Sequence, residues 1–260
     1  MPTIKVNNID CYYEIHGQGK PLLLIAGLGS DSQSWEPALT ELTRHYKVIV
    51  FDNRGIGRTN YPNESFDIST LAKDSVGLMD ELKINQANIL GHSMGGYIAQ
   101  EIALNYPQRV NKLILASTAT ITSERNKFLF TNLLRFLEEG ISYELFLKEF
   151  LFWIFAPEFF TNKENFDSIM KYLLDYPYPI TLEGFKKQTE AVNNFKSLGR
   201  VEAETLIMAG KKDILITPEE TENLATRINK AQLVFLKNAA HSIHIEETKN
   251  FIKHMVDFLK

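Results

Sequence analysis

The sequence lacks the features that mark secreted, membrane or disulfide-stabilised proteins. Its 260 residues include one cysteine, Cys11, which cannot form an internal disulfide. The first residues, MPTIKVNNIDCYYEIHG, contain no apolar segment behind a basic end, and the longest apolar runs, such as FLFWIFA at 150–156, are too short to cross a bilayer. We therefore expect a soluble protein of a reducing cytoplasm, with no membrane partner.

The sequence also lacks a basic stripe, an internal repeat and a low-complexity linker. The formal net charge is -4, and Lys and Arg are scattered along the chain, which argues against a nucleic-acid partner. Hydrophobic residues make up 44% of the chain, enough for one substantial core. We expect a monomer or a homodimer built on a single core with an insertion.

Apolar runs and helical patterns alternate along most of the chain. An antiparallel hairpin is expected from about 2 to 16, followed by six runs typical of buried strands at 21–27, 46–52, 87–92, 110–117, 204–210 and 231–238. Amphipathic helical patterns lie between or after them at 34–44, 68–83, 94–105, 218–228 and 245–259. This alternation predicts an α/β protein with a mostly parallel eight-stranded sheet and helices on both faces.

The alternation is interrupted between about 120 and 200. This part of the chain contains only helical patterns, punctuated by Pro157, Pro177 and Pro179. We expect residues 120–199 to form an inserted helical cap and residues 1–119 and 200–260 to form the core. Ligands of open α/β sheets bind outside the carboxyl ends of the strands, so the cap is expected to cover a site at that edge.

The segment ILGHSMGGYIA at 89–99 places Ser93 among three glycines, directly after a strand and before a helix. G-x-S-x-G in that context is typical of a nucleophile elbow, a strained turn that presents a serine hydroxyl at the sheet edge. Glycine is needed where a side chain would collide with neighbouring backbone, which explains Gly91 and Gly95. Ser93 is therefore the candidate nucleophile, with an idle serine in a tight turn as the alternative.

A serine nucleophile needs a base and an acid that orients the base, and in this arrangement both follow the serine along the chain. Asp213 follows the strand at 204–210, whereas the loop after 110–117, TATITS, has no carboxylate. His241 comes first after the strand at 231–238, so it is preferred as the base over His244, which we expect at the surface or in a supporting role. His92, next to the serine, is expected to pack structurally.

Acyl transfer also needs backbone donors for the oxyanion. The N–H of Met94, after the nucleophile, and that of Leu28, in the glycine-rich turn AGLGSDSQSW, are the candidates. This chemistry uses only side chains and backbone, so we expect no cofactor and no metal.

The motifs AGLGSDSQSW, FDNRGIGRTNYP, GHSMGG, AGKKDILITP and AAHSIHIEE together resemble the α/β-hydrolase superfamily over nearly the full chain. Within it, the sequence is similar to the branch of small carboxylesterases, 3-oxoadipate enol-lactonases and aminoacrylate hydrolases. Two positions depart from common family patterns: Ala26 precedes Gly27 where many relatives have His, and Thr248 stands where many have Pro. Neither departure touches the candidate triad.

The resemblance implies a serine hydrolase that cleaves a small ester or lactone through an acyl-enzyme. A carbon–carbon bond hydrolase, an amide or small-peptide hydrolase and a ligand-binding relative without catalysis remain alternatives. Serine at 93 argues against the superfamily's dehalogenases and epoxide hydrolases, whose nucleophile is an aspartate. Arg54 is expected to be structural.

The cap segment FLFWIFAPEFF suggests an apolar pocket for a small substrate, with Phe152, Trp153 and Phe155 as candidate lining residues. Packing within the cap is the alternative for these aromatic side chains. An anionic lactone would require a cation in the pocket, and the sequence does not select one among Arg125, Lys127, Arg135, Lys186 and Lys187.

Overall fold

The computed structural model describes residues 2–197 and 199–260. Met1 and Leu198, which we assigned to the core and to the end of the cap, lie outside the described residues. The strands are β1 (Thr3–Val6), β2 (Ile9–His16), β3 (Lys20–Ile25), β4 (Tyr46–Phe51), β5 (Ala87–His92), β6 (Val110–Ala116), β7 (Glu204–Gly210) and β8 (Gln232–Leu236). Across these ranges, no helix is both long and apolar enough to pass through a membrane.

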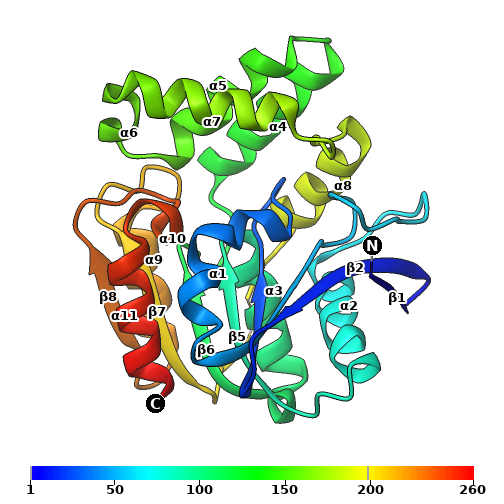
Figure 1. Ribbon diagram of the computed structural model, residues 1–260, viewed down its shortest axis with the longest axis vertical. Coiled ribbons are helices and arrows are strands. Elements are labelled where there is room, and N and C mark those ends of the chain that lie inside the picture. The colour runs from blue at the N-terminus through cyan, green and yellow to red at the C-terminus, as the bar shows by residue number, and fades with distance from the viewer. Residues whose placement is uncertain (1, 198) are drawn as a thin grey trace.

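The eight strands form one sheet in the order β1-β2-β4-β3-β5-β6-β7-β8 (Figure 1). β1 pairs with β2, and β2 with β4, in antiparallel fashion, and the remaining neighbours are parallel. The central strand β5 is buried along its whole length, as expected for a strand covered on both faces. The predicted fold class, a mostly parallel eight-stranded α/β sheet that starts with a hairpin, is confirmed.

Helices cover both faces of the sheet and create two apolar layers. The helices outside the insertion are α1 (Glu36–Leu42), α2 (Ile68–Glu81), α3 (Met94–Asn105), α9 (Pro218–Arg227), α10 (Ile243–Glu246) and α11 (Thr248–Leu259), with 3₁₀ turns η1 (Ser32–Trp35) and η2 (Pro107–Arg109). Leu71 of α2 and Ile98 of α3 lie in one buried cluster, and Leu42 of α1 and Phe251 of α11 lie in the other. The helices thus pack against both faces of the sheet, and this packing holds the ends of the strands in position.

Five helices are inserted between β6 and β7 and lie over one edge of the sheet (Figure 1). They are α4 (Glu124–Glu138), α5 (Tyr143–Ile154), α6 (Pro157–Thr161), α7 (Lys163–Asp175) and α8 (Leu182–Asn193). The insertion is helical, as the patterns between 120 and 200 predicted, and it includes the short helix α6, which begins at Pro157. The two ends of the insertion meet, because Ile121 bridges to Lys196 and the N–H of Ser197 donates to the carbonyl of Thr120. We call α4–α8 the cap helices.

Candidate active site

Ser93 lies in a sharp turn between β5 and α3. Its backbone angles, φ 55° and ψ -118°, fall outside the regions that non-glycine residues favour. The N–H of Ser93 donates to the carbonyl of Ala116 at 2.9 Å, and its own carbonyl accepts the Thr118 hydroxyl at 2.9 Å. Contacts with the end of β6 therefore hold the strained turn in place.

The glycines around Ser93 are required by close backbone approach, as predicted. A β-carbon on Gly91 would lie 2.0 Å from the carbonyl oxygen of Gly95, and one on Gly95 would lie 2.1 Å from that of Ile25. A β-carbon on Gly96 would lie 2.6 Å from the side chain of Thr118. Even the methyl group of an alanine at these positions would collide with its neighbours. The strand, the turn and the helix therefore pack at a distance that only glycine permits.

Asp213 and His241 form a buried pair. Oδ2 of Asp213 lies 2.8 Å from Nδ1 of His241, and Oδ1 accepts the N–H groups of Leu215 and Ile216 at 2.8 and 2.9 Å. Both oxygens of the carboxylate are thus engaged, which fixes its orientation. A proton on Nδ1 faces the carboxylate, so Nε2 is left as the acceptor of the ring.

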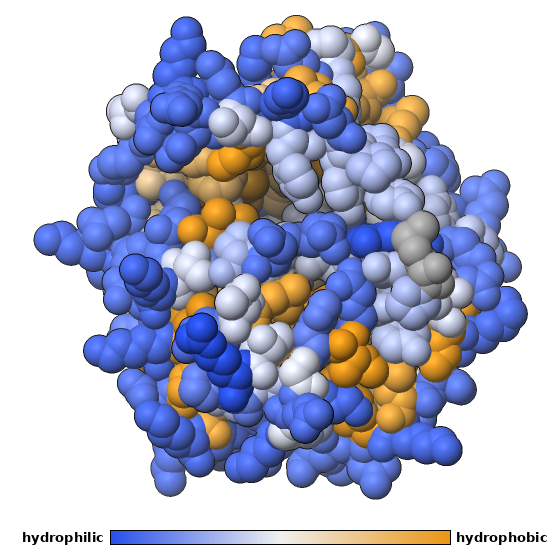
Figure 2. Space-filling view, in the orientation of Figure 1, coloured by the Kyte–Doolittle hydropathy of each residue, from blue (hydrophilic) through white to orange (hydrophobic). Residues whose placement is uncertain are grey.

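Ser93 and His241 line one cavity of about 410 Å³, enclosed between the cap helices and the ends of the strands. Figure 2 shows the hollow between the cap and the core, with hydrophobic residues on its walls. Most of the side chains contributed by the cap are apolar or aromatic, including Phe130, Leu147, Phe150 and Ile154. The candidate nucleophile and base therefore meet in an apolar chamber of a size suited to a small molecule.

The cavity contains one of the three predicted pocket residues. Phe155 lines it, whereas Phe152 and Trp153 do not, and these two assignments are wrong. Phe152 is 55% exposed, and the indole N–H of Trp153 donates to Glu149 on the same helix. The helical period explains the difference, because the residues of α5 that line the cavity recur at three- and four-residue spacing and leave 152 and 153 on the other side.

The candidate oxyanion donors lie beside Ser93. Gly27 packs against the nucleophile so closely that a β-carbon there would lie 3.1 Å from Cβ of Ser93, and Leu28 follows it in the wall of the cavity. Met94 opens α3, and the first N–H groups of a helix have no partner within it. Both backbone segments thus lie next to the side chain of Ser93.

His92 and His244 form a buried cluster with His241 that the sequence did not predict. His244 is not a surface residue: its side chain is buried between Trp35 and His92, at ring-centroid distances of 4.7 and 4.6 Å. Nε2 of His92 lies 2.9 Å from the carbonyl oxygen of His241, so it donates there and supports the loop that carries the candidate base.

Burial controls the ionisation of these two histidines. Burial, and to a lesser extent the neighbouring His241, lower the pKa of His244 to about 3. Burial also holds the pKa of His92 well below its ordinary value, and the neighbouring His244 and His241 lower it further. The carbonyl of Ser34 lies near His244 and opposes the shift, although neither ring nitrogen makes a hydrogen bond within the described residues. Both rings are therefore neutral at physiological pH.

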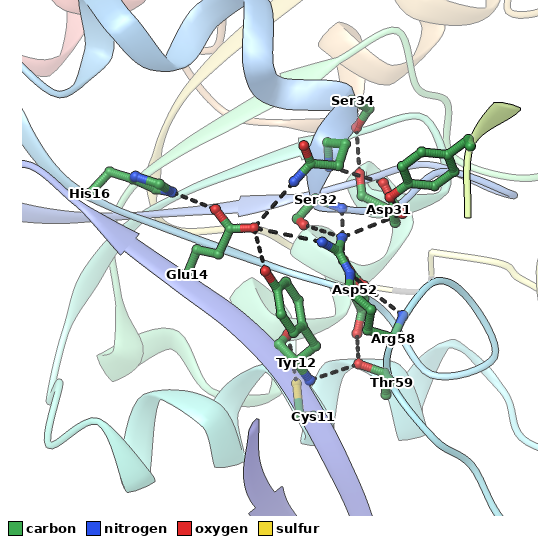
Figure 3. A network of polar contacts seen from close by, with 12 residues as sticks. Cys11, Tyr12, Glu14, His16, Asp31, Ser32, Ser34, Asp52, Arg58 and Thr59 are labelled. Atoms are coloured by element: carbon green, nitrogen blue, oxygen red, sulfur yellow. Dashed lines mark hydrogen bonds and ion pairs between the residues drawn. The ribbon is translucent and has the colours of Figure 1, made fainter. Parts of the chain in front are cut away.

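A network of carboxylates surrounds Arg58 next to Asp31, which lines the cavity (Figure 3). The guanidinium contacts Asp52 at 2.8 and 3.0 Å and Asp31 at 3.4 Å, and it lies over the ring of Tyr12 at 3.9 Å. Asp31 also accepts the hydroxyl of Tyr176 from the cap. Arg54 is bound elsewhere, in a buried ion pair with Asp74 at 2.7 Å, which agrees with a structural role.

Glu246 joins the cap to the loop of His241. One carboxylate oxygen accepts the N–H of Ala156 at 2.7 Å, and the other accepts that of Ala240 at 2.9 Å. The N–H of Ser242 donates to the carbonyl of Ile154 at 3.0 Å beside them. The C-terminal end of α5 is thus attached on both sides of His241.

A serine in a strand–turn–helix elbow, in a mostly parallel sheet beneath a helical insertion, is the arrangement of an α/β hydrolase. The chain belongs to this family, since the family model described as alpha/beta hydrolase fold matches residues 20–248.

Two solved structures and one curated protein illustrate the range of similar proteins. The enol-lactonase from Burkholderia xenovorans LB400 is 26% identical, with 99% of both chains covered and a TM-score of 0.89. A thermophilic esterase from Thermogutta terrifontis is also 26% identical, with 99% of this chain and 96% of that chain covered and a TM-score of 0.85. "Putative carbamate hydrolase RutD" of Stutzerimonas stutzeri (strain A1501) is 27% identical over 95% of this chain and 96% of its own.

Proposed function

We propose that the protein is a cofactor-independent serine hydrolase that cleaves a small carboxylic ester or lactone through an acyl-enzyme. The observation that carries the proposal is the meeting of Ser93, in its strained turn, and the His241–Asp213 pair at one apolar cavity. The similar lactonase and esterase, each 26% identical over almost the whole chain, support the choice of ester and lactone substrates.

In the proposed reaction, Nε2 of His241 takes the hydroxyl proton of Ser93 while Oγ attacks the substrate carbonyl carbon. The electron pair of the carbonyl moves to its oxygen, where the N–H groups of Leu28 and Met94 stabilise the charge. The bond to the alcohol oxygen then breaks, and the leaving group takes the proton from the imidazolium. Asp213 holds the ring in the tautomer that this transfer needs.

Water completes the cycle. His241 takes a proton from a water molecule, whose oxygen attacks the acyl carbon and releases the carboxylic acid, and the proton returns to Oγ of Ser93. In a lactone the alcohol and the acid stay in one molecule, so a single ring-opened hydroxy acid leaves.

We also propose that residues 120–199 act as a cap domain over a core of residues 1–119 and 200–260. The pairing of Thr120 and Ile121 with Ser197 and Lys196 supports these boundaries, since the insertion leaves and rejoins the core at one place. The cap helices supply much of the cavity wall, which supports their role in selecting substrate size.

Labelling with a fluorophosphonate tests the proposal directly. The probe should react with the intact protein and not with Ser93→Ala, because it modifies only an activated serine. Substrate screening should then find turnover on small esters or lactones. Turnover confined to amides or to diketones would place the enzyme in a different reaction class, and an unlabelled protein without turnover would indicate a binding protein on a hydrolase fold.

A further inference from the structure

The wall of the cavity carries two carboxylates and, within the residues that the structure describes, no lysine or arginine. Asp31 and Glu36 line it, and none of its lining residues is a lysine or an arginine. Its three histidines include two whose pKa values are lowered by burial. None of the five cations considered from the sequence is among the lining residues: Lys127 pairs with Glu124, Arg135 with Glu139 and Lys187 with the loop at 62–63. Arg125 donates to the backbone carbonyl of Leu215, behind the wall of the cavity.

The charge of Asp31 is only partly compensated. Arg58 makes its short contacts with Asp52 and reaches Asp31 only at 3.4 Å. Burial and the neighbouring charge of Asp52 raise the pKa of Asp31, against the hydrogen bonds from Tyr176 and from the N–H of Gln33. Glu36, at the exposed start of α1, forms no ion pair with any described residue. This end of the cavity therefore has a negative field.

Tyrosines from the cap surround the two carboxylates. The hydroxyl of Tyr176 donates to Asp31, and the rings of Tyr172 and Tyr176 lie 5.9 Å apart. Burial raises the pKa of Tyr172, the charges of Asp31 and Glu36 raise it further, and the charge of Arg58 opposes them, so this side chain lies within the field of both acids. Burial also raises the pKa of Tyr143, with a contribution from Asp31.

A buried polar side chain lies next to Glu36. His244 packs against Trp35, directly before Glu36, and lines the cavity; the backbone of Ser34 lies near one of its ring nitrogens, and the other has no partner within the described residues. One nitrogen of a neutral imidazole donates and the other accepts. Buried polar atoms of this kind are normally satisfied, so the cavity offers hydrogen bonds to a ligand as well as charge.

We propose that the region between Asp31, Glu36, Tyr172 and Tyr176 is a subsite for a positively charged, ammonium-bearing part of the substrate. Carboxylates together with aromatic faces attract such cations, both through charge and through the ring quadrupole. The inference rests on the proposed function, because the subsite belongs to the same cavity as Ser93. Substrates with an anionic group are disfavoured at this subsite, because no lysine or arginine lines the cavity to bind that group.

Three acetate esters of matched size test the charge preference. They are acetylcholine, its uncharged isostere with a quaternary carbon in place of nitrogen, and 2-acetoxyethanesulfonate. We expect kcat/KM for acetylcholine to exceed that for the isostere by about tenfold, within the range that cation–π contacts provide, and the sulfonate to be the poorest of the three. A ratio at or below one between acetylcholine and its isostere would overturn the subsite.

Charge-neutralising variants locate the effect. Glu36→Gln and Asp31→Asn should each lower the ratio of acetylcholine to isostere turnover. Glu81→Gln, which removes the same charge at the exposed end of α2, should leave the ratio at the wild-type value. If Asp31→Asn does not fold, because Asp31 belongs to the Arg58 network, Glu36→Gln alone decides. An unchanged ratio in Glu36→Gln and in every folded Asp31 variant would contradict the assignment.

Calorimetry separates this inference from the proposed function. Choline and its carbon isostere are titrated into the wild-type protein, which requires no hydrolysis. Tighter binding of choline, weakened in Glu36→Gln, supports the subsite even if no ester is turned over and Ser93 is not labelled. Equal or weaker binding of choline refutes the subsite, even if the neutral ester is hydrolysed and the proposed function stands.

Discussion

Gly95 and Ile25 approach each other so closely that a β-carbon on Gly95 would lie 2.1 Å from the carbonyl oxygen of Ile25. Gly95 lies in the first turn of α3, and Ile25 is the last residue of β3, so this contact joins the helix after Ser93 to the strand before the oxyanion loop. The distance between the proposed nucleophile and the proposed donor of Leu28 is therefore set by the absence of one side chain.

Gly95→Ala should destabilise the protein by about 3 kcal/mol, since backbone on both sides must move to admit the methyl group. Esterase activity should fall along with stability, because the oxyanion loop and Ser93 separate. Gly140→Ala is the matched control: nothing lies within 4 Å of its β-carbon, and its φ of +75° costs only about 1 kcal/mol. Urea denaturation and ester turnover measure both effects, and equal losses in the two variants would contradict the steric role.

Ser93→Ala and His241→Ala should each lower kcat by about 10⁴-fold or more, and the double variant should lose little beyond either one, because residues that act as a unit are not additive. Asp213→Asn should also be severe, since it disturbs the tautomer of His241. Ser65→Ala, at an exposed serine, serves as the control. Near-normal turnover in Asp213→Asn would show that another acid orients the histidine.

The cap should limit the length of the acyl chain. Each methylene that fits the apolar cavity adds about 0.8 kcal/mol of burial, whereas one that meets a wall adds none, so kcat/KM should rise and then fall within a few carbons. Phe155→Ala should shift the maximum to longer chains, because Phe155 lines the cavity. Phe152→Ala, on the same helix but 55% exposed, should leave the maximum unchanged. A profile that still rises with lipid-like chains would contradict the small cavity.

Acid should destabilise the fold through His244. Its folded pKa of about 3 lies below the ordinary value of 6.5, so its contribution to stability is present above 6.5 and is lost as pH falls towards 3. Between about pH 7.5 and about pH 5 this residue should cost about 2 kcal/mol of unfolding free energy.

Urea denaturation at both pH values measures that loss in the wild type and in His244→Gln, which does not titrate. The variant should lose about 2 kcal/mol less than the wild type over the same interval. His45→Gln, which removes an exposed histidine, should behave as the wild type does. The same loss in His244→Gln and in the wild type would show that other groups cause the acid sensitivity.

The sequence predicted the features that depend on local pattern. The strand preceding Ser93 and the helix following it are where the apolar run and the glycines placed them, β5 at Ala87–His92 and α3 at Met94–Asn105. Asp213 and His241 were selected by their place after a strand, and the structure brings their side chains to 2.8 Å. The carboxyl ends of parallel strands lie at one edge of the sheet, which is why so short a set of motifs was sufficient.

The sequence did not predict features that depend on which way a side chain points. Phe152, Trp153 and Phe155 are all apolar neighbours. The rotation of α5 turns Phe152 and Trp153 away from the cavity, whereas Phe155, in extended backbone just past the end of the helix, lines it. His244 was expected at the surface or in a supporting role because His241 comes first after the strand, and position along the chain does not show that Trp35 and His92 enclose its ring. The ion pairs of Arg58 with Asp31 and Glu14 join residues far apart in the chain, and no local pattern encodes them.

The contacts of Glu246 determine how the cap can be exchanged between related proteins. Its carboxylate accepts the N–H of Ala156 from the cap and that of Ala240 beside His241, so a chimera joined only at 120 and 199 would receive a foreign cap without its matching attachment. Recombination between relatives is expected to preserve activity best when residues 240–246 are inherited together with the cap. The unit of exchange in this fold is therefore discontinuous in the sequence, and it includes the loop that holds the histidine.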